Sequence, residues 1–125
     1  MNLSSRQARG AMIVRVEEAR IDSLVAIRFK DAMRSIVPEL DHDNSADATA
    51  RIEPCPVILD LAEVTFVDSS GLGAIVAVMK FLAPGQRLEL AALQPNVLRV
   101  FRLTRMDGVF VIHDKAPGGG DQHAA

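Results

Sequence analysis

An acid and two hydroxyls stand at the junction between apolar segments of the chain. The run VTFVDSSGLGAIVAVMKFL, residues 64–82, is interrupted by Asp68, Ser69, Ser70 and two glycines. Asp and Ser side chains accept hydrogen bonds from the unpaired N–H groups of a first helical turn, so a helix cap is one interpretation. Two hydroxyls beside an acid at the positive end of a helix also form a site where a phosphoryl group could be added and partly stabilised. The residues leave both interpretations open.

The surrounding residues do not complete the common catalytic patterns. A nucleophile elbow requires glycine two residues before and two residues after its serine, and neither Ser69 nor Ser70 has both. The GLGAIV segment lacks the third glycine of a dinucleotide fingerprint, and no phosphate-binding loop motif occurs. The metal-ligating residue types lack metal-site spacing: His42, Cys55, His113 and His123. We therefore expect no enzymatic activity, no cofactor and no metal site.

The segment after the junction predicts a helix over residues 70–82 that is apolar on two sides. At about 100° per residue, the side expected to face a sheet carries Leu72, Ile75, Val76, Met79 and Leu82. The other side has Lys80 as its only charge, whereas a surface helix normally carries several. We interpret it as a docking surface, and the alternatives are burial under an acidic loop or within a homodimer. The candidate partner-binding residues are Leu72, Ala74, Ala77, Val78 and Phe81.

Strand and helix patterns alternate ahead of this junction. Residues 12–16 (MIVRV) predict a strand, and a helix capped by Asp22 or Ser23 follows it. The inward stripe of that helix is expected to be Val25, Phe29, Met33 and Ile36. The short apolar run at 57–61 (VILDL) is typical of a strand buried on both faces of a parallel sheet.

The same alternation continues after the junction. Residues 88–93 predict a strand, residues 95–106 a helix that begins with Pro95, and residues 109–112 a last strand. Alternating strands and helices predict an α/β fold with right-handed crossovers.

The chain length fits one domain. With 125 residues, the chain is long enough for one core and too short for two. We assign residues 12–113 to this domain, with residues 38–54 as an acidic surface loop inserted in it. Residues 1–11 are expected to be a flexible N-terminus, and residues 114–125 a disordered tail.

Composition excludes several function classes. No apolar run reaches the roughly 18 to 20 residues that a membrane span needs, so we expect no membrane insertion. A net charge of −2 gives no electrostatic footprint for nucleic acid. The single cysteine, Cys55, cannot form an internal disulfide, and the N-terminus lacks the order of a secretory signal. These features favour a cytoplasmic protein.

Two long segments resemble a known family. VILDLAEVTFVDSSGLGAIVAV, followed by LELAALQPNVLRVFRLTRMDGVFVI, is similar to the STAS domain of bacterial anti-sigma-factor antagonists. The resemblance implies a single small α/β domain, a mixed β-sheet with helices packed mainly on one face, and no enzymatic activity. It also implies a Gly-x-Leu-Asp element, which reads Ala19-Arg20-Ile21-Asp22 in this chain.

The resemblance also implies a function by partner switching. The unphosphorylated domain would bind an anti-sigma factor with a histidine-kinase-like ATPase fold, which acts as a serine kinase. Phosphorylation would release the domain, and a metal-dependent serine phosphatase would reverse the modification. Ser69 would be the acceptor, with Ser70 as runner-up and with Asp68, Gly71 and Asp22 as neighbours of the site.

A second function class stays open beside partner switching. The same fold could serve as a subunit of a membrane transport complex or a stress-signalling scaffold without being phosphorylated.

Overall fold

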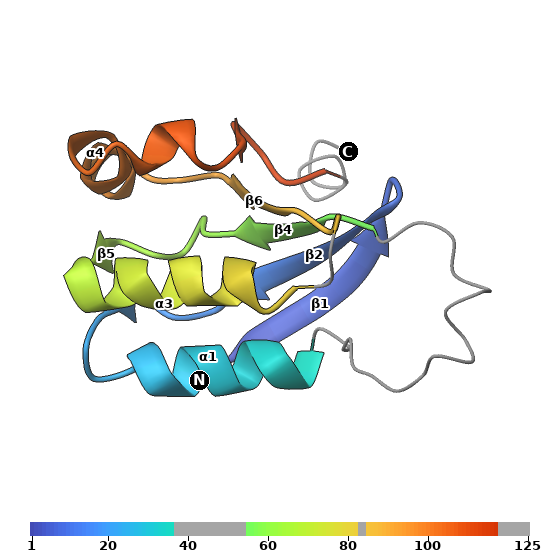
Figure 1. Ribbon diagram of the computed structural model, residues 1–125, viewed down its shortest axis with the longest axis horizontal. Coiled ribbons are helices and arrows are strands. Elements are labelled where there is room, and N and C mark those ends of the chain that lie inside the picture. The colour runs from blue at the N-terminus through green and yellow to red at the C-terminus, as the bar shows by residue number, and fades with distance from the viewer. Residues whose placement is uncertain (37–54, 83–84, 118–125) are drawn as a thin grey trace.

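The computed structural model describes residues 1–36, 55–82 and 85–117 (Figure 1). Within these residues the main sheet has five strands in the order β1-β2-β4-β6-β7. They are β1 (Leu3–Ala8), β2 (Ala11–Val16), β4 (Val57–Asp60), β6 (Leu88–Ala91) and β7 (Ile112–His113). β1 runs antiparallel to β2, and the other neighbours are parallel. The predicted mixed sheet is confirmed.

The helices of the described chain connect the parallel strands. They are α1 (Ala26–Ile36), α3 (Ser69–Lys80) and α4 (Pro95–Leu103), each lying between successive parallel strands in sequence. Right-handed connections place such helices on one face of a sheet. Figure 1 shows α1 and α3 lying side by side along the sheet. The predicted α/β architecture, with helices mainly on one face, is confirmed.

The main core lies between the helices and the sheet. Alternate residues of β2, β4 and β6 face the helices, and Phe29, Ile75 and Phe101 bring α1, α3 and α4 into the same cluster. The opposite face of the sheet has a smaller cluster: Ala11, Ile13, Ile58, Ala91 and Ala116. None of the helices in the described part of the chain is long and apolar enough to cross a membrane.

A second, two-stranded sheet is formed by the short strands that precede α1 and α3. Its strands are β3 (Arg20–Ile21), which follows β2, and β5 (Phe66–Val67), which precedes α3. They are parallel, with Arg20 opposite Phe66 and Ile21 opposite Val67. The pairing brings the segment before α1 beside the segment before α3, although 45 positions separate Ser23 from Asp68.

The N-terminus differs from its prediction as a flexible segment. Residues 3–8 form β1, paired along its whole length with β2. The turn between them consists of Arg9 (φ 52°) and Gly10 (φ 78°), and positive φ at both central positions is the geometry of a tight hairpin turn. Because β1 is a mostly exposed edge strand, its sequence LSSRQA shows little of the apolar alternation that a sequence search detects.

The C-terminal part also differs in its boundaries. α4 ends at Leu103, a 3₁₀ helix covers Met106–Gly108, and β7 starts at Ile112 rather than at residue 109. Residues 114–117, predicted to be part of a disordered tail, are described: Pro117 accepts a hydrogen bond from Arg6 at 3.0 Å. The predicted loop at 38–54 and the rest of the tail, 118–125, lie outside the described residues.

Candidate functional site

Asp68 caps the helix that carries the two serines. It lies immediately before α3 in an extended conformation, and its Oδ1 accepts the N–H of Gly71 at 2.8 Å. Its carbonyl oxygen accepts the N–H of Leu72 at 2.8 Å, the first turn of the helix. The helix cap predicted from the sequence is confirmed, and α3 begins at Ser69, one residue earlier than predicted.

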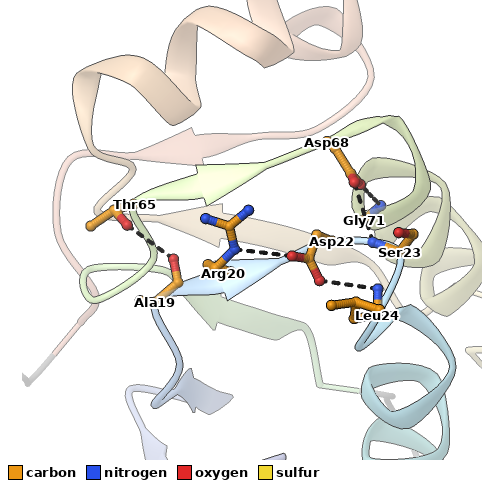
Figure 2. Close-up of polar contacts among 8 residues, drawn as sticks. All are labelled: Ala19, Arg20, Asp22, Ser23, Leu24, Thr65, Asp68 and Gly71. Carbon is orange, nitrogen blue, oxygen red and sulfur yellow. Dashed lines mark hydrogen bonds and ion pairs between the residues drawn. The ribbon is translucent and has the colours of Figure 1, made fainter.

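Asp68 also ties two helices together. Its second oxygen, Oδ2, accepts the N–H of Ser23 at 3.2 Å, in the turn that leads into α1 (Figure 2). The backbone N–H of Asp68 donates to the carbonyl of Ile21 at 3.4 Å. One carboxylate therefore fixes the start of α3 relative to the start of α1, and no sequence pattern predicts this second contact.

Both candidate phosphoacceptors are exposed at the start of α3. Ser69 is the first residue of the helix and Ser70 the second. Their hydroxyls therefore lie where the unpaired N–H groups of a first turn and the helix dipole favour an anion. A kinase could reach either side chain without unfolding the domain.

Gly71 is required by a close backbone contact. A Cβ at this position would lie 1.8 Å from the carbonyl oxygen of Ile21, far inside van der Waals contact. The absence of a side chain lets the first turn of α3 lie directly against β3. Gly73, two residues later, has no such constraint, because a Cβ there would meet nothing within 4 Å.

Asp22, the other predicted neighbour of the site, is buried at the end of β3. Its Oδ2 accepts a hydrogen bond from Arg20 Nε at 3.0 Å, and its Oδ1 accepts the N–H of Leu24 at 3.1 Å (Figure 2). The Arg20 hydrogen bond, with help from the Leu24 N–H, lowers the pKa of Asp22 despite the opposing effect of burial. Asp22 thus stays ionised and caps the turn that precedes α1.

Ala19, at the glycine position of the implied Gly-x-Leu-Asp element, has an ordinary backbone conformation. It is not among the non-glycine residues with positive φ. Its carbonyl accepts the N–H of Thr65 at 2.7 Å and the Thr65 hydroxyl at 3.1 Å. The turn into β3 therefore forms without a glycine.

The predicted exposure of the second side of α3 is wrong. Ala74 and Val78 are buried, and so is Leu72 in the first turn. The reason is that α1 packs alongside α3 and covers this side. A helix projection assumes one buried side, whereas α3 is buried on two.

Two of the candidate partner-binding residues stay partly exposed. These are Ala77 and Phe81, near the end of α3. The Arg34 guanidinium of α1 lies over the Phe81 ring, 4.5 Å from its centroid. Phe81 therefore already has a partner within the domain.

Sequence reasoning missed the exposed apolar residues at the start of α1 and in β5. Leu24 is 83% exposed and Ile27 is 68% exposed, and both lie where α1 begins. Phe66 of β5 is partly exposed, with the Arg20 guanidinium 4.3 Å from its ring centroid. A signal existed, because Leu24 and Ile27 fall outside the inward stripe that Phe29 and Met33 continue.

The site has no metal-binding cluster in the described residues. No group of three or more His, Cys, Asp or Glu side chains there could hold a metal ion. His113 contacts Glu89 on the helix-free side of the sheet, with Nε2 2.8 Å from Oε1. Cys55 is a free thiol just before β4.

Comparisons with known proteins agree with this architecture. The family model of the STAS domain matches residues 2–116. A crystal structure of an anti-sigma factor antagonist from Mycobacterium paratuberculosis is 24% identical, with a TM-score of 0.69, and the match covers 98% of this chain and 91% of that one. The Bacillus cell fate determinant SpoIIAA in its phosphorylated form is 16% identical, with a TM-score of 0.57 and 98% of both chains covered.

A transporter-related protein has the same fold. A sulfate transporter family protein from Wolinella succinogenes is 13% identical, with a TM-score of 0.60, and the match covers 86% of this chain and 79% of that one. At these identities the structures show a shared fold.

Proposed function

Because this chain belongs to the STAS domain family, we propose that it is a cytoplasmic anti-sigma-factor antagonist whose Ser69 is reversibly phosphorylated. The unphosphorylated form binds an anti-sigma factor that has a histidine-kinase-like ATPase fold and acts as a serine kinase. Phosphorylation of Ser69 releases the antagonist, and a metal-dependent serine phosphatase restores the binding form. The antagonist itself catalyses no reaction.

One observation carries the proposal. An exposed serine is the first residue of a helix whose cap, Asp68, is held by two backbone N–H groups, those of Gly71 and Ser23. The hydroxyl is thus accessible to a kinase, and it lies at a helix start that two hydrogen bonds of Asp68 hold in place. Ser70 is exposed as well, so it is the alternative acceptor.

Electrostatics gives the switch its direction. A phosphoserine adds a charge of about −1.5 to −2 beside the carboxylate of Asp68. A carboxylate of the partner that lies about 4 Å from the phosphate is repelled by about 4 kcal/mol per pair of unit charges at an effective dielectric constant near 20, and salt reduces this value. A surviving repulsion of about 1.4 to 4 kcal/mol weakens a contact about ten- to a thousandfold. This is enough to release a partner whose matching surface is acidic.

The test is direct phosphorylation followed by mapping. Candidate serine kinases from the source genome are incubated with the protein and ATP, and mass spectrometry locates the phosphate in the wild type, Ser69→Ala and Ser70→Ala. We expect modification at Ser69, lost in Ser69→Ala and kept in Ser70→Ala. A phosphate on Ser70 alone would reassign the acceptor, and Ser69→Asp with wild-type affinity for the kinase would contradict the direction of the switch.

A second candidate function is a structural subunit that is never phosphorylated. The shared fold with a sulfate transporter family protein favours it as the alternative, in which the domain docks on a transport complex or a stress-signalling scaffold. This structural function would be favoured if neither serine carries phosphate after incubation with every candidate kinase, nor in protein isolated from the cell.

A further inference from the structure

A small surface hollow lies at the turn before α1, where the N–H of Ser23 donates to Asp68. It has a volume of about 250 Å³ and is lined by Glu18, Ala19, Arg20, Asp22, Leu24 and Val25. These residues come from the segment between β2 and β3, from β3 and from the turn before α1.

The hollow is linked to the start of α3 through Ser23, which lies between two of its lining residues, Asp22 and Leu24. Asp68, the residue before Ser69, accepts the N–H of Ser23, and Leu24 follows Ser23 in the chain. Figure 2 shows Asp68, Ser23, Leu24, Asp22 and Arg20 in one neighbourhood. A protein that contacts the Ser69 hydroxyl is therefore within reach of Leu24.

The charged groups around the hollow already have partners within the protein. Arg20 and Asp22 form an ion pair at 3.0 Å, and Glu18 accepts the backbone N–H of Asn2 at 2.8 Å. An uncharged side chain can enter such a site without leaving a charge unpaired, whereas an added charge would compete with these pairs. The charge balance therefore favours an apolar occupant.

The size and rim of the hollow fit one side chain. Its volume is below the roughly 300 to 1,000 Å³ of small-molecule and cofactor sites. Leu24 on its wall is 83% exposed, and Ile27, in the first turn of α1, is 68% exposed. Exposed apolar residues around a concave site are the usual surroundings of an anchoring side chain in an interface.

We propose that this hollow receives an apolar anchor side chain of the serine kinase that binds the unphosphorylated protein, with Leu24 and Ile27 forming the contact around it. The inference rests on the proposed function, because it names the surface through which the same partner binds. It replaces the buried side of α3 as the main docking surface. Phosphorylation of Ser69 then places charge at the edge of an apolar contact.

Two substitutions test the hollow from opposite directions. Leu24→Ser removes apolar surface from its wall, and Ala19→Leu adds bulk that fills it. Leu103→Ser is the matched control, because Leu103 is 73% exposed and lies on α4, which Figure 1 places on the other side of α3 from α1. Thermal unfolding of each variant verifies that the fold is intact.

The measurement is the dissociation constant for each histidine-kinase-like serine kinase of the source genome, loaded with ADP and Mg²⁺, by biolayer interferometry. We expect Leu24→Ser and Ala19→Leu to bind at least about tenfold more weakly than wild type, and Leu103→Ser to bind within about twofold. If the wild type binds a kinase and both hollow variants bind equally well, the hollow is not the contact and the proposed function stands. If no kinase binds the wild type, the proposed function fails, and this inference fails with it.

Discussion

One methyl group at Gly71 tests how closely α3 lies against β3. A Cβ there would be 1.8 Å from the carbonyl oxygen of Ile21 and 2.7 Å from its carbonyl carbon. Both are backbone atoms of a strand paired with β5, so they cannot rotate away as the end of a side chain would. The separation between Cβ and oxygen must grow from 1.8 Å to at least 3.0 Å, a displacement of about 1.2 Å.

The expected change in the free energy of unfolding for Gly71→Ala combines two opposing effects. Overpacking a closely packed site costs about 1 to 3 kcal/mol, and we expect the upper end because the displacement also strains the hydrogen bond between Asp68 and the Gly71 N–H. Replacing glycine by alanine within a helix favours folding by up to about 1 kcal/mol. A net loss of at least about 2 kcal/mol in the free energy of unfolding should therefore remain for Gly71→Ala.

Urea unfolding followed by far-ultraviolet circular dichroism measures this loss, since the chain has no Trp or Tyr for fluorescence. The control is Gly73→Ala, two residues along the same helix, where the added methyl group meets nothing within 4 Å. The control should leave stability unchanged or raise it by up to about 1 kcal/mol. A Gly71→Ala midpoint equal to or above that of the wild type would refute the close approach of α3 to β3.

Three further predictions concern Asp68, Asp22 and Phe101. Asp68→Ala should lower the free energy of unfolding in urea by about 0.5 to 2 kcal/mol, because it removes the cap of α3 as well as the acceptor for the Ser23 N–H. An unchanged urea midpoint would contradict the capping role of Asp68. Asp22 has a lowered pKa in the folded state, so its contribution is complete above the unfolded pKa near 4 and is lost as the pH falls through the folded value. The stability difference between wild type and Asp22→Asn should therefore shrink from pH 7 to about pH 3, and a difference independent of pH would oppose this assignment. Phe101→Ala should lower the free energy of unfolding by about 3 to 5 kcal/mol, since Phe101 is fully buried and packs edge-on against Phe110, with 6.1 Å between the ring centroids. A smaller loss in urea unfolding would mean that the core repacks around the cavity.

Local patterns in the sequence were enough for the architecture and for the helix cap. Alternating strand and helix periods predicted the order of β2, α1, β4, α3, β6 and α4, because backbone periodicity and burial on one side depend on neighbours close in sequence. The cap at Asp68 was predictable for the same reason, since its acceptor and the Gly71 N–H are three residues apart.

Edges and boundaries were less predictable. β1 was missed because an edge strand with both faces largely exposed needs no apolar alternation, and its pairing with β2 is visible only in three dimensions. The start of β7 was misplaced because the 3₁₀ helix at Met106–Gly108 and the burial of Phe110 depend on contacts with α4.

What the sequence alone determined is the α/β order of elements and a capped helix that begins with two adjacent serines. Only the tertiary structure decided that Ala74 and Val78 are buried by α1, that Asp68 also holds Ser23, and that Gly71 touches Ile21. These contacts join segments about 45 to 50 residues apart, and they depend on how the parallel strands β3 and β5 align. A periodicity tells which side of a helix is apolar, but only the packing of neighbouring elements decides how many sides are covered.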